Sequence, residues 1–311
     1  MTKPLGKIIR RIRTFIGVKV LFRRLPYAYS RYYYRKHLGK ELNYRHPSDF
    51  NEKLFWLARY WQDPRIIQCA DKISVRQYVS SLGLERILPT VYAIYDSVDQ
   101  IDFNVLPQCF VLKTNHGGGG KNMVFCKDKS SLDTVAAIKE IARGLKDIIG
   151  LDTCEYQYQY IQPKAYAEEY LGLGAEKLEI QFFCFNGRAR HILVRNDLGD
   201  KANNSFAISY DLNWNRVADR RNEDMSITVP KPVVLDDMIH TANTLAAPFP
   251  QVRIDMILVG NNYFFGEMTF STSGNILWNY PDETVRRWGD ELTLPPKLRT
   301  KWRKLYKSYA K

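Results

Sequence analysis

The sequence predicts an α+β fold that combines antiparallel strand pairs with helices. Two hairpin signals support this prediction. Residues 178–195 form two alternating runs around an Asn-Gly pair, and residues 252–271 form two runs of β-branched and aromatic residues around a Gly-Asn-Asn turn. Helical patterns lie between these strands. Because 311 residues exceed what one core usually organises, we expect two or three lobes.

The positive charge of the chain is concentrated at its two ends. Residues 1–45 hold 13 Lys and Arg against one acid, and residues 297–311 hold 7 against none, whereas the segment between them holds 26 against 32. The body is therefore an ordinary, mildly acidic globule between two basic extensions, and we expect the second extension to be helical.

The first 25 residues place apolar side chains such as Ile8, Ile12 and Phe15 at helical spacing, with Lys and Arg between them. A helix with one apolar and one basic face is typical of an anchor that lies in the plane of a membrane, and the tyrosines that follow suit an interface. The expected partner is an anionic membrane surface. The alternatives are a structural helix docked on the body, or stacking on single-stranded nucleic acid, which no accompanying motif supports.

Cysteine usage indicates the cellular compartment. The five cysteines are scattered, with no C-x-x-C pair, and no His stands at metal spacing. Neither a signal peptide nor an apolar run of membrane-spanning length is evident. We therefore expect a reduced, cytoplasmic setting without structural zinc, with the protein peripheral on the inner face of the plasma membrane.

Two helices are expected before the first predicted strand. Asp49, with Glu52 three residues later, resembles a capping box, and the apolar pattern of a helix follows it. A second helical pattern covers residues 72–82 and ends at Gly83.

A glycine-rich loop, T-N-H-G-G-G-G-K, separates two predicted strands at 110–113 and 122–126. Its backbone N–H groups can approach phosphate oxygens closely. It is not a Walker A loop, because Asn115 replaces the first glycine and Asn122 replaces the Ser or Thr that follows the lysine. It leads into a strand rather than a helix, so the dinucleotide-binding fingerprint is also excluded.

The second half of the chain is expected to alternate between helices and strands. A helix is expected near 131–148, before the apolar segment 165–171 and the first hairpin. Residues 197–230 are polar with few apolar runs, which predicts a long functional loop. Two prolines then precede a helix near 235–247, which leads to the second hairpin.

Polar side chains occupy alternating positions in the second hairpin. Arg253 and Asp255 share a face of its first arm, and Glu267 and Thr269 share a face of its second arm. A two-residue turn would pair Asp255 with Gly266, whereas the three-residue turn that we predict sets Asp255 opposite Glu267. One face would then hold oxygen ligands for Mg²⁺ beside a guanidinium for a phosphoryl group. The alternative is an amphipathic hairpin whose polar face is merely solvated.

Six segments, in order, resemble the ATP-grasp superfamily and its TupA-like branch, which is associated with teichuronopeptide and other cell-surface polysaccharides. They are F-N-E-K-L (50–54), D-K-I-S-V-R-Q-Y-V (71–79), F-V-L-K-T-N-H-G-G-G (110–119), A-E-E-Y-L (167–171), F-F-C-F-N-G (182–187) and the R-I-D and F-G-E-M-T-F arms of the second hairpin.

The resemblance implies the ATP-grasp fold, in which two α+β lobes grip ATP, here with a basic helical N-terminal extension. The expected divisions are the extension (1–45), a helical subdomain (46–109), a lid with the glycine-rich loop (110–170), a sheet subdomain with the metal site (171–296) and a basic C-terminal helix (297–311).

The resemblance also implies how ATP is bound. Lys72 and Lys113 match the lysines that reach the α- and β-phosphates, and Glu168 matches the hinge acid that recognises the adenine amino group. The remaining expected nucleotide-binding residues lie in the loop, in the hinge and on the following strand: Thr114, His116, Gly117, Gly118, Gly119, Gly120, Glu169, Tyr170, Leu171 and Glu179.

The resemblance implies a magnesium site on the second hairpin. Asp255 and Glu267 match its ligands, and Arg253 matches the arginine at the transferring phosphate, so that Arg253 and Lys113 are the expected catalytic residues. Thr269 stands where the superfamily commonly has Asn, and it can still supply an oxygen to the metal. Gln181 stands where this branch is expected to have a lysine.

The implied function is ATP- and Mg²⁺-dependent ligation of a carboxylate to an amine, through an acyl phosphate, on a cell-surface polysaccharide or its precursor. The expected substrates are ATP, a carboxylate-bearing sugar or glycan, and an amine such as an amino acid. One alternative keeps the site and phosphorylates a hydroxyl, as a kinase does. A second is a non-catalytic basic protein that binds membranes or nucleic acid.

Overall fold

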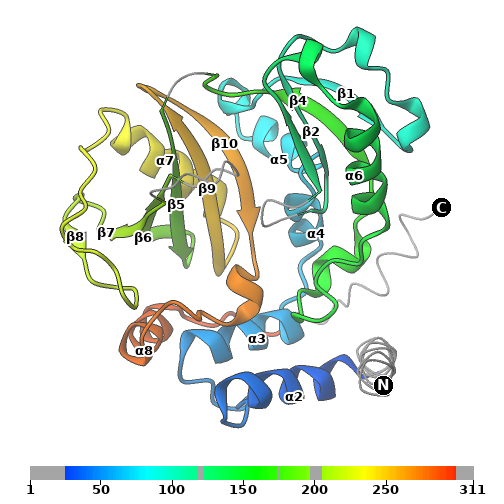
Figure 1. Cartoon of the computed structure of the whole chain (residues 1–311). Helices are drawn as coiled ribbons and strands as arrows, with labels where there is room; N and C mark the ends of the chain where they lie inside the picture. Colours follow the sequence, from blue (N-terminus) through cyan, green and yellow to red (C-terminus); the bar gives the residue numbers. More distant parts are fainter. Residues whose placement is uncertain (1–24, 118–121, 174–175, 197–204, 299–311) are drawn as a thin grey trace, which may run out of the picture.

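The computed structural model describes residues 25–117, 122–173, 176–196 and 205–298. It confirms the α+β prediction, because two antiparallel sheets are each packed against helices (Figure 1). The smaller sheet has the strand order β1-β4-β2-β3, and the larger has the order β10-β9-β5-β6-β7-β8. The strands are β1 Val91–Tyr95, β2 Phe110–Thr114, β3 Met123–Cys126, β4 Ala165–Glu169, β5 Lys177–Phe185, β6 Arg188–Arg195, β7 Ala207–Tyr210, β8 Arg216–Val217, β9 Gln251–Val259 and β10 Asn262–Thr269.

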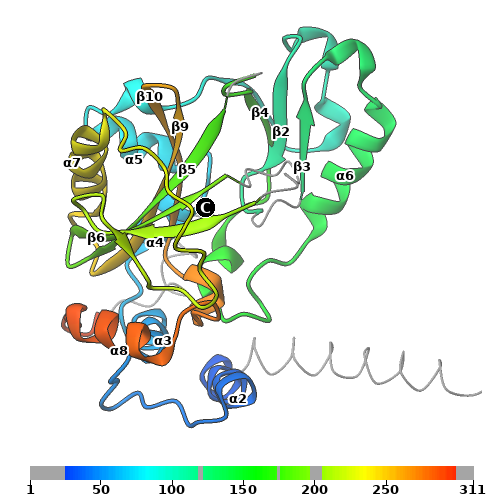
Figure 2. The same cartoon turned by 60° about the vertical axis from the view of Figure 1, so that its left-hand side comes forward.

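Helices α6 and α7 pack against the sheets, and α2, α3 and α8 lie below the sheets in Figure 1. Figure 2 shows α7 against the larger sheet and α6 against the smaller one. The described helices are α2 Pro26–Leu38, α3 Phe50–Tyr60, α4 Pro64–Ala70, α5 Val75–Ser81, α6 Thr134–Lys146, α7 Leu235–Ala246 and α8 Asp282–Glu291.

Local signals account for most of these helices. Asp49 caps α3 and accepts a hydrogen bond from the Glu52 N–H at 2.9 Å, as the capping-box pattern predicted. The helices expected near 131–148 and 235–247 are confirmed as α6 and α7. The helix expected over 72–82 is shorter, since α5 begins at Val75 after a turn in which Ser74 Oγ donates to Asp71 Oδ2.

The sequence patterns did not predict α4, α8 or β1. The helix α8 has the polar sequence DETVRRWGDE, in which few residues, Val285 and Trp288 among them, provide an apolar face. Trp288 is 1% exposed and packs against Phe183 and Phe185 of β5, so tertiary burial stabilises a helix whose sequence pattern is weak. The short helix α4 and the strand β1 carry similarly weak patterns.

The turn of the second hairpin differs from the prediction. Val259 pairs with Asn262, so the turn has two residues, and its first residue, Gly260, has a φ of +58°. The pairing of Asp255 with Glu267 is nevertheless present, because a β-bulge at Gly266 shifts the register by one residue. The predicted three-residue turn is therefore wrong, and the bulge produces the alignment that the turn was expected to produce.

The long loop predicted for residues 197–230 is also wrong in part. Within its described portion, β7 pairs with β6 and β8 pairs with β7, so this segment widens the larger sheet. These strands are only four and two residues long, and such short strands leave little pattern in a sequence.

The core divides between the lobes. The larger core lies on both faces of the large sheet, between α7 on one side and α3 and α8 on the other. The smaller core packs Phe110, Leu112 and Ala167 of the small sheet against Ile141 of α6. The hairpin and the small sheet are thus fixed on separate cores, and side chains between them can be positioned by both lobes.

Three predictions fall outside the described residues: the amphipathic pattern of residues 1–24, the glycines Gly118 to Gly120, and the C-terminal helix beyond residue 298. The boundary at residue 110 between the helical subdomain and the lid remains a prediction. The strand β1 lies before this boundary but shares a sheet with β2, which lies after it. None of the helices in the described segments has both the length and the hydropathy needed to cross a bilayer.

Candidate active site

The polar face of the β9–β10 hairpin forms a closed network of charges. The Arg253 guanidinium donates to both oxygens of Asp255, from Nε at 2.7 Å and from Nη2 at 2.5 Å. Its Nη2 also lies 3.3 Å from Glu267 Oε1 and 3.2 Å from Thr269 Oγ1, and the Thr269 hydroxyl donates to Glu267 at 2.8 Å. All four side chains share one face, because Arg253 opposes Thr269 and Asp255 opposes Glu267.

The two carboxylates of the hairpin have different electrostatic environments. Burial alone would raise the pKa of Glu267, but Lys72 and Arg253 outweigh it and lower the pKa to about 2. Asp255 is 1% exposed, and burial raises its pKa because the paired Arg253 offsets only part of the desolvation. Glu267 is therefore the more firmly ionised of the two.

A third carboxylate lies on the neighbouring strand. Gln181 of β5 donates to Glu179 Oε2 at 3.0 Å and to Asp255 Oδ2 at 3.3 Å, which brings Glu179 into the same network. Desolvation and the charge of Asp255 raise the pKa of Glu179 to about 8. Gln181 bridges two acids at the position where a lysine was expected.

Lys72 connects the hairpin to the glycine-rich loop. Its Nζ lies 3.0 Å from Glu267 Oε2 and donates to the carbonyl oxygen of Gly117 at 2.6 Å. Its side chain is only 11% exposed. The lysine therefore belongs to the site, even though most lysines of a folded chain are on the surface.

Asn115 positions Lys72, and our sequence analysis missed this role. Its side-chain amide donates to Asp71 Oδ1 at 2.9 Å and to the Gln162 carbonyl at 3.0 Å, and accepts from the Lys164 N–H at 2.8 Å. Its backbone carbonyl accepts from the Lys72 N–H at 3.0 Å. Asn115 is 1% exposed, so it joins three segments from inside the protein. The Asn in the T-N-H sequence was a visible signal, but we considered it only as a departure from the Walker A pattern.

Lys113 and Glu168 form an ion pair on the small sheet. Lys113 opposes Tyr166 and Val111 opposes Glu168, so all four side chains share one face. The Lys113 ammonium also lies 5.4 Å from the centre of the Tyr166 ring. Lys113 and Glu168 are therefore adjacent, as expected for two residues of one site, and each neutralises the other.

The hinge residues after Glu168 point in different directions. Glu169 accepts from the Thr90 N–H at 3.1 Å, and alternation along the strand directs it away from Lys113. Tyr170 is buried, with the Lys177 ammonium 4.6 Å from its ring centre, and Leu171 is buried beside it. Of the two acids, only Glu168 lies on the face of Lys113.

The remaining loop residues that the structure describes are buried. Thr114 and His116 are each 2% exposed, and Thr114 Oγ1 has no hydrogen-bond partner in the described part of the chain. Burial lowers the pKa of His116, so its imidazole is neutral at pH 7. His116 Nε2 lies 3.3 Å from the Asp147 carbonyl. These contacts support the loop where it leaves β2.

The hairpin oxygens fit a magnesium ion that is shared with a phosphate ligand. Within the described ranges, no group of three or more His, Cys, Asp or Glu side chains could hold a metal ion. Magnesium, however, is usually bound by only one or two carboxylates together with phosphate and water oxygens. Asp255, Glu267 and the Thr269 hydroxyl supply such a set on one face of the hairpin.

Two antiparallel α+β lobes, with Lys72, Arg253 and Glu267 brought together between them, are consistent with a protein of the ATP-grasp class. The TupA-like ATPgrasp family model matches residues 52–293, and the chain therefore belongs to that family. No curated protein matches the chain in sequence.

Several solved structures resemble the chain. An L-amino acid ligase from Bacillus licheniformis is 12% identical with a TM-score of 0.43, over 67% of this chain and 44% of its own. A D-alanine–D-alanine ligase from Bacillus anthracis, complexed with ATP, is 14% identical with a TM-score of 0.43, over 71% of this chain and 61% of its own. The D-alanine–D-alanine ligase of Helicobacter pylori is 11% identical with a TM-score of 0.44, over 79% and 70%. The chain thus spans less than two thirds of the length of the first two of these proteins.

Proposed function

We propose that this protein is an ATP- and Mg²⁺-dependent carboxylate–amine ligase that acts on a cell-surface polysaccharide or its precursor. The observation that carries the proposal is the meeting of Lys72, Arg253 and Glu267 between the lobes. Their clustering collects charge where a triphosphate and its metal would need it. Membership of the TupA-like ATP-grasp family supports ATP as the nucleotide. The surface polysaccharide is proposed because the TupA-like branch is associated with such polymers.

In this proposal the two lysines bind phosphate oxygens of ATP. Each lysine is held by a carboxylate in the structure, Lys72 by Glu267 and Lys113 by Glu168. A phosphate can replace the carboxylate as partner, and this releases Glu168 to accept a hydrogen bond from the adenine amino group. The backbone of Tyr170 and Leu171, two and three residues after Glu168, would provide the remaining contacts to the base.

Asp255, Glu267 and Thr269 would hold the magnesium ion. The bound ion would neutralise charge on the phosphates as the γ-phosphoryl group moves. The role of the protein is then to hold Arg253 in place: two hydrogen bonds to Asp255 fix its guanidinium, and its Nη2 remains directed at Glu267 and Thr269. A fixed guanidinium needs no reorganisation when charge develops on the transferring group.

The proposed reaction has two steps. A substrate carboxylate oxygen attacks the γ-phosphorus and ADP leaves with the electrons of the broken bond, which produces an acyl phosphate. The amine attacks the acyl carbon, inorganic phosphate leaves, and the amine loses a proton. No nucleophile from the protein takes part, so the chain has to position substrates and stabilise charge.

The experiment that tests this function measures ADP release with panels of sugar acids and amines. A ligase requires a carboxylate and an amine together. ADP release with a neutral sugar alone would instead indicate a kinase. If Asp255→Asn changes neither ADP release nor any other function of the protein, the catalytic proposal is wrong and a non-catalytic binding role remains.

We also propose that the basic ends hold the protein at an anionic membrane. The support is the net charge of +12 in residues 1–45, where each Lys or Arg near such a surface is worth about 1 kcal/mol. Ile12→Asp combined with Phe15→Asp should reduce co-sedimentation with anionic vesicles, because most of the basic charge remains but the apolar stripe is broken. Unchanged binding by this variant, or equal binding to neutral vesicles, would contradict the anchor.

A further inference from the structure

The polar face of the hairpin continues beyond Arg253 and Thr269. Gln251 lies two residues before Arg253 on β9, and Ser271 lies two residues after Thr269 at the end of β10. Because side chains two apart on a strand share a face, Gln251 is on the face of Arg253, roughly 7 Å further along the strand. A substrate bound at Arg253 could therefore reach the surroundings of Gln251.

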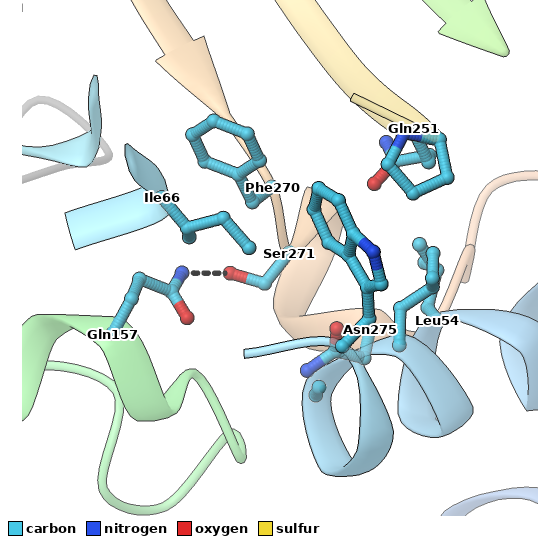
Figure 3. Close-up of a pocket in the computed structure, with 11 residues that line it drawn as sticks. Leu54, Ile66, Gln157, Gln251, Phe270, Ser271 and Asn275 are labelled. Carbon is cyan, nitrogen blue, oxygen red and sulfur yellow. Dashed lines mark hydrogen bonds between the residues drawn. The ribbon is translucent and has the colours of Figure 1, made fainter. Parts of the chain in front are cut away.

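A pocket of about 30 Å³ lies at this end of the face, which is room for about two water molecules or a small chemical group (Figure 3). The residues that line it carry no charge. They are Leu54, Leu57, Ala58, Trp61, Ile66, Gln157, Pro250, Gln251, Phe270, Ser271 and Asn275. The pocket combines apolar side chains, several of them from α3 and α4, with three amides and a hydroxyl.

Gln251 is the unsatisfied member of this lining. It is 3% exposed, and its Nε2 has no hydrogen-bond partner in the described part of the chain. The other polar groups are engaged: Gln157 donates to Ser271 Oγ at 2.7 Å, and the Ser271 hydroxyl donates to Glu155 at 2.8 Å. A buried amide N–H without a partner costs about 1–3 kcal/mol, so this position favours a ligand that provides one.

The chemistry of the lining restricts the class of that ligand. A charged group would lose its hydration among neutral residues without gaining an ion pair, so the bound group is neutral. The side chains of Leu54, Trp61 and Ile66 favour an apolar portion, whereas the unpaired Gln251 Nε2 favours a hydrogen-bond acceptor. An acetamido group has a methyl, a carbonyl and an N–H within a few atoms, and it fits both requirements.

We propose that this pocket is a subsite for the acetamido group of an acetamido sugar acid whose carboxylate lies at Arg253. The inference rests on the proposed function. A carboxyl and an acetamido group on opposite sides of one pyranose ring are separated by a span comparable to the distance from Arg253 to Gln251. The methyl packs against the α3 and α4 side chains, and the amide pairs with Gln251. The pocket thereby selects N-acetylated over simple sugar acids.

The test compares binding of N-acetylglucosaminuronate with binding of glucuronate by titration calorimetry, using the full chain with ADP and Mg²⁺. The acetamido acid should bind about tenfold more tightly, which corresponds to one hydrogen bond and a buried methyl group. Gln251→Met keeps the length of the side chain but removes its amide, and it should abolish most of this preference. Gln77→Met makes the same chemical change on the exposed face of α5 and should retain it.

A second variant tests the pocket by volume. Ala58→Leu narrows it from the α3 side and should also remove the preference, without changing any hydrogen-bonding group. Equal affinities of the two acids for the wild-type protein, or no binding of either, would refute the subsite, and the pocket would then hold water only. A preference that persists in both variants would also refute it.

The subsite and the ligase can fail separately. A tenfold preference without amine-dependent ADP release would support the subsite and contradict the ligase. Amine-dependent ADP release without a preference for the acetamido acid would support the ligase and contradict the subsite.

Discussion

The ion pair on the small sheet and the charge network on the hairpin differ in how their charges are held. Lys113 and Glu168 neutralise each other as a simple pair. On the hairpin, Arg253 is shared by Asp255, Glu267 and Thr269, and Glu267 is also bound by Lys72. A pair can exchange its partner for a ligand with little effect on its surroundings, whereas a change in a network affects every member. This difference suggests that the small sheet binds the nucleotide and that the hairpin performs the chemistry.

The largest effect on activity is expected from substitutions in the charge network of the hairpin. Glu267→Gln keeps the size of the side chain but removes a charge that Lys72, Arg253 and the proposed metal share, so ADP release should fall by about 10²–10³-fold or more. Asp255→Asn should have a comparable effect, and circular dichroism should show an intact fold for both. Near-normal ADP release by Glu267→Gln with Mg²⁺ would contradict the mechanism.

A smaller effect is expected from a substitution in the Lys113–Glu168 ion pair. Lys113→Ala should weaken ATP binding by about 1.5–3 kcal/mol, because one charge-assisted hydrogen bond to phosphate is lost. Titration calorimetry with ATP measures this loss. The control change Lys177→Ala removes a lysine of β5 whose ammonium lies 4.6 Å from the centre of the Tyr170 ring, and it should weaken ATP binding less. Equal losses in both variants would contradict a specific phosphate contact of Lys113.

The bulge of β10 provides a third test, of how the network is aligned. A Cβ at Gly266 would lie 2.8 Å from the Asp255 carbonyl oxygen, so Gly266→Ala should cost about 1–3 kcal/mol in the free energy of unfolding and also reduce ADP release. Gly260→Ala in the turn meets no atom within 4 Å, although its φ is positive, and should cost about 1 kcal/mol with activity retained. Denaturant unfolding and ADP assays of both variants separate the two roles. Full activity of Gly266→Ala would show that the bulge is dispensable.

The smallest effect is expected from Glu179. Its folded-state pKa of about 8 lies above the ordinary value of 4.5, so its contribution to stability is present below pH 4.5 and is lost as the pH rises through 8. Glu179→Gln resembles the protonated form, and in metal-free buffer it should be more stable than the wild type at pH 9 by about 1 kcal/mol. Thermal unfolding between pH 5 and pH 9 measures this. A pH profile identical to that of the wild type would contradict the raised pKa.

The prediction of the fold from the sequence was accurate where the pattern is local. The cap at Asp49, the Asn-Gly hairpin and the strands beside the glycine-rich loop depend on neighbouring residues alone. The helix α8 was not predicted, because the packing of Trp288 stabilises it more than its own sequence does. The strands β7 and β8 were not predicted, because β7 depends on pairing with β6, and β8 on pairing with β7.

Strand periodicity is enough to predict that Arg253 and Asp255 share a face, and that Glu267 and Thr269 share a face, because side-chain direction along a strand has a period of two. The coincidence of these two faces depends on how the two strands pair in the folded protein. An even turn would have separated them, and the bulge at Gly266 restores the alignment by adding one residue to one strand. The contact of Lys72 with Glu267 and the position of Gln251 at a pocket lined by α3 and α4 were likewise decided by packing, since residues far apart in the chain meet only when the lobes assemble.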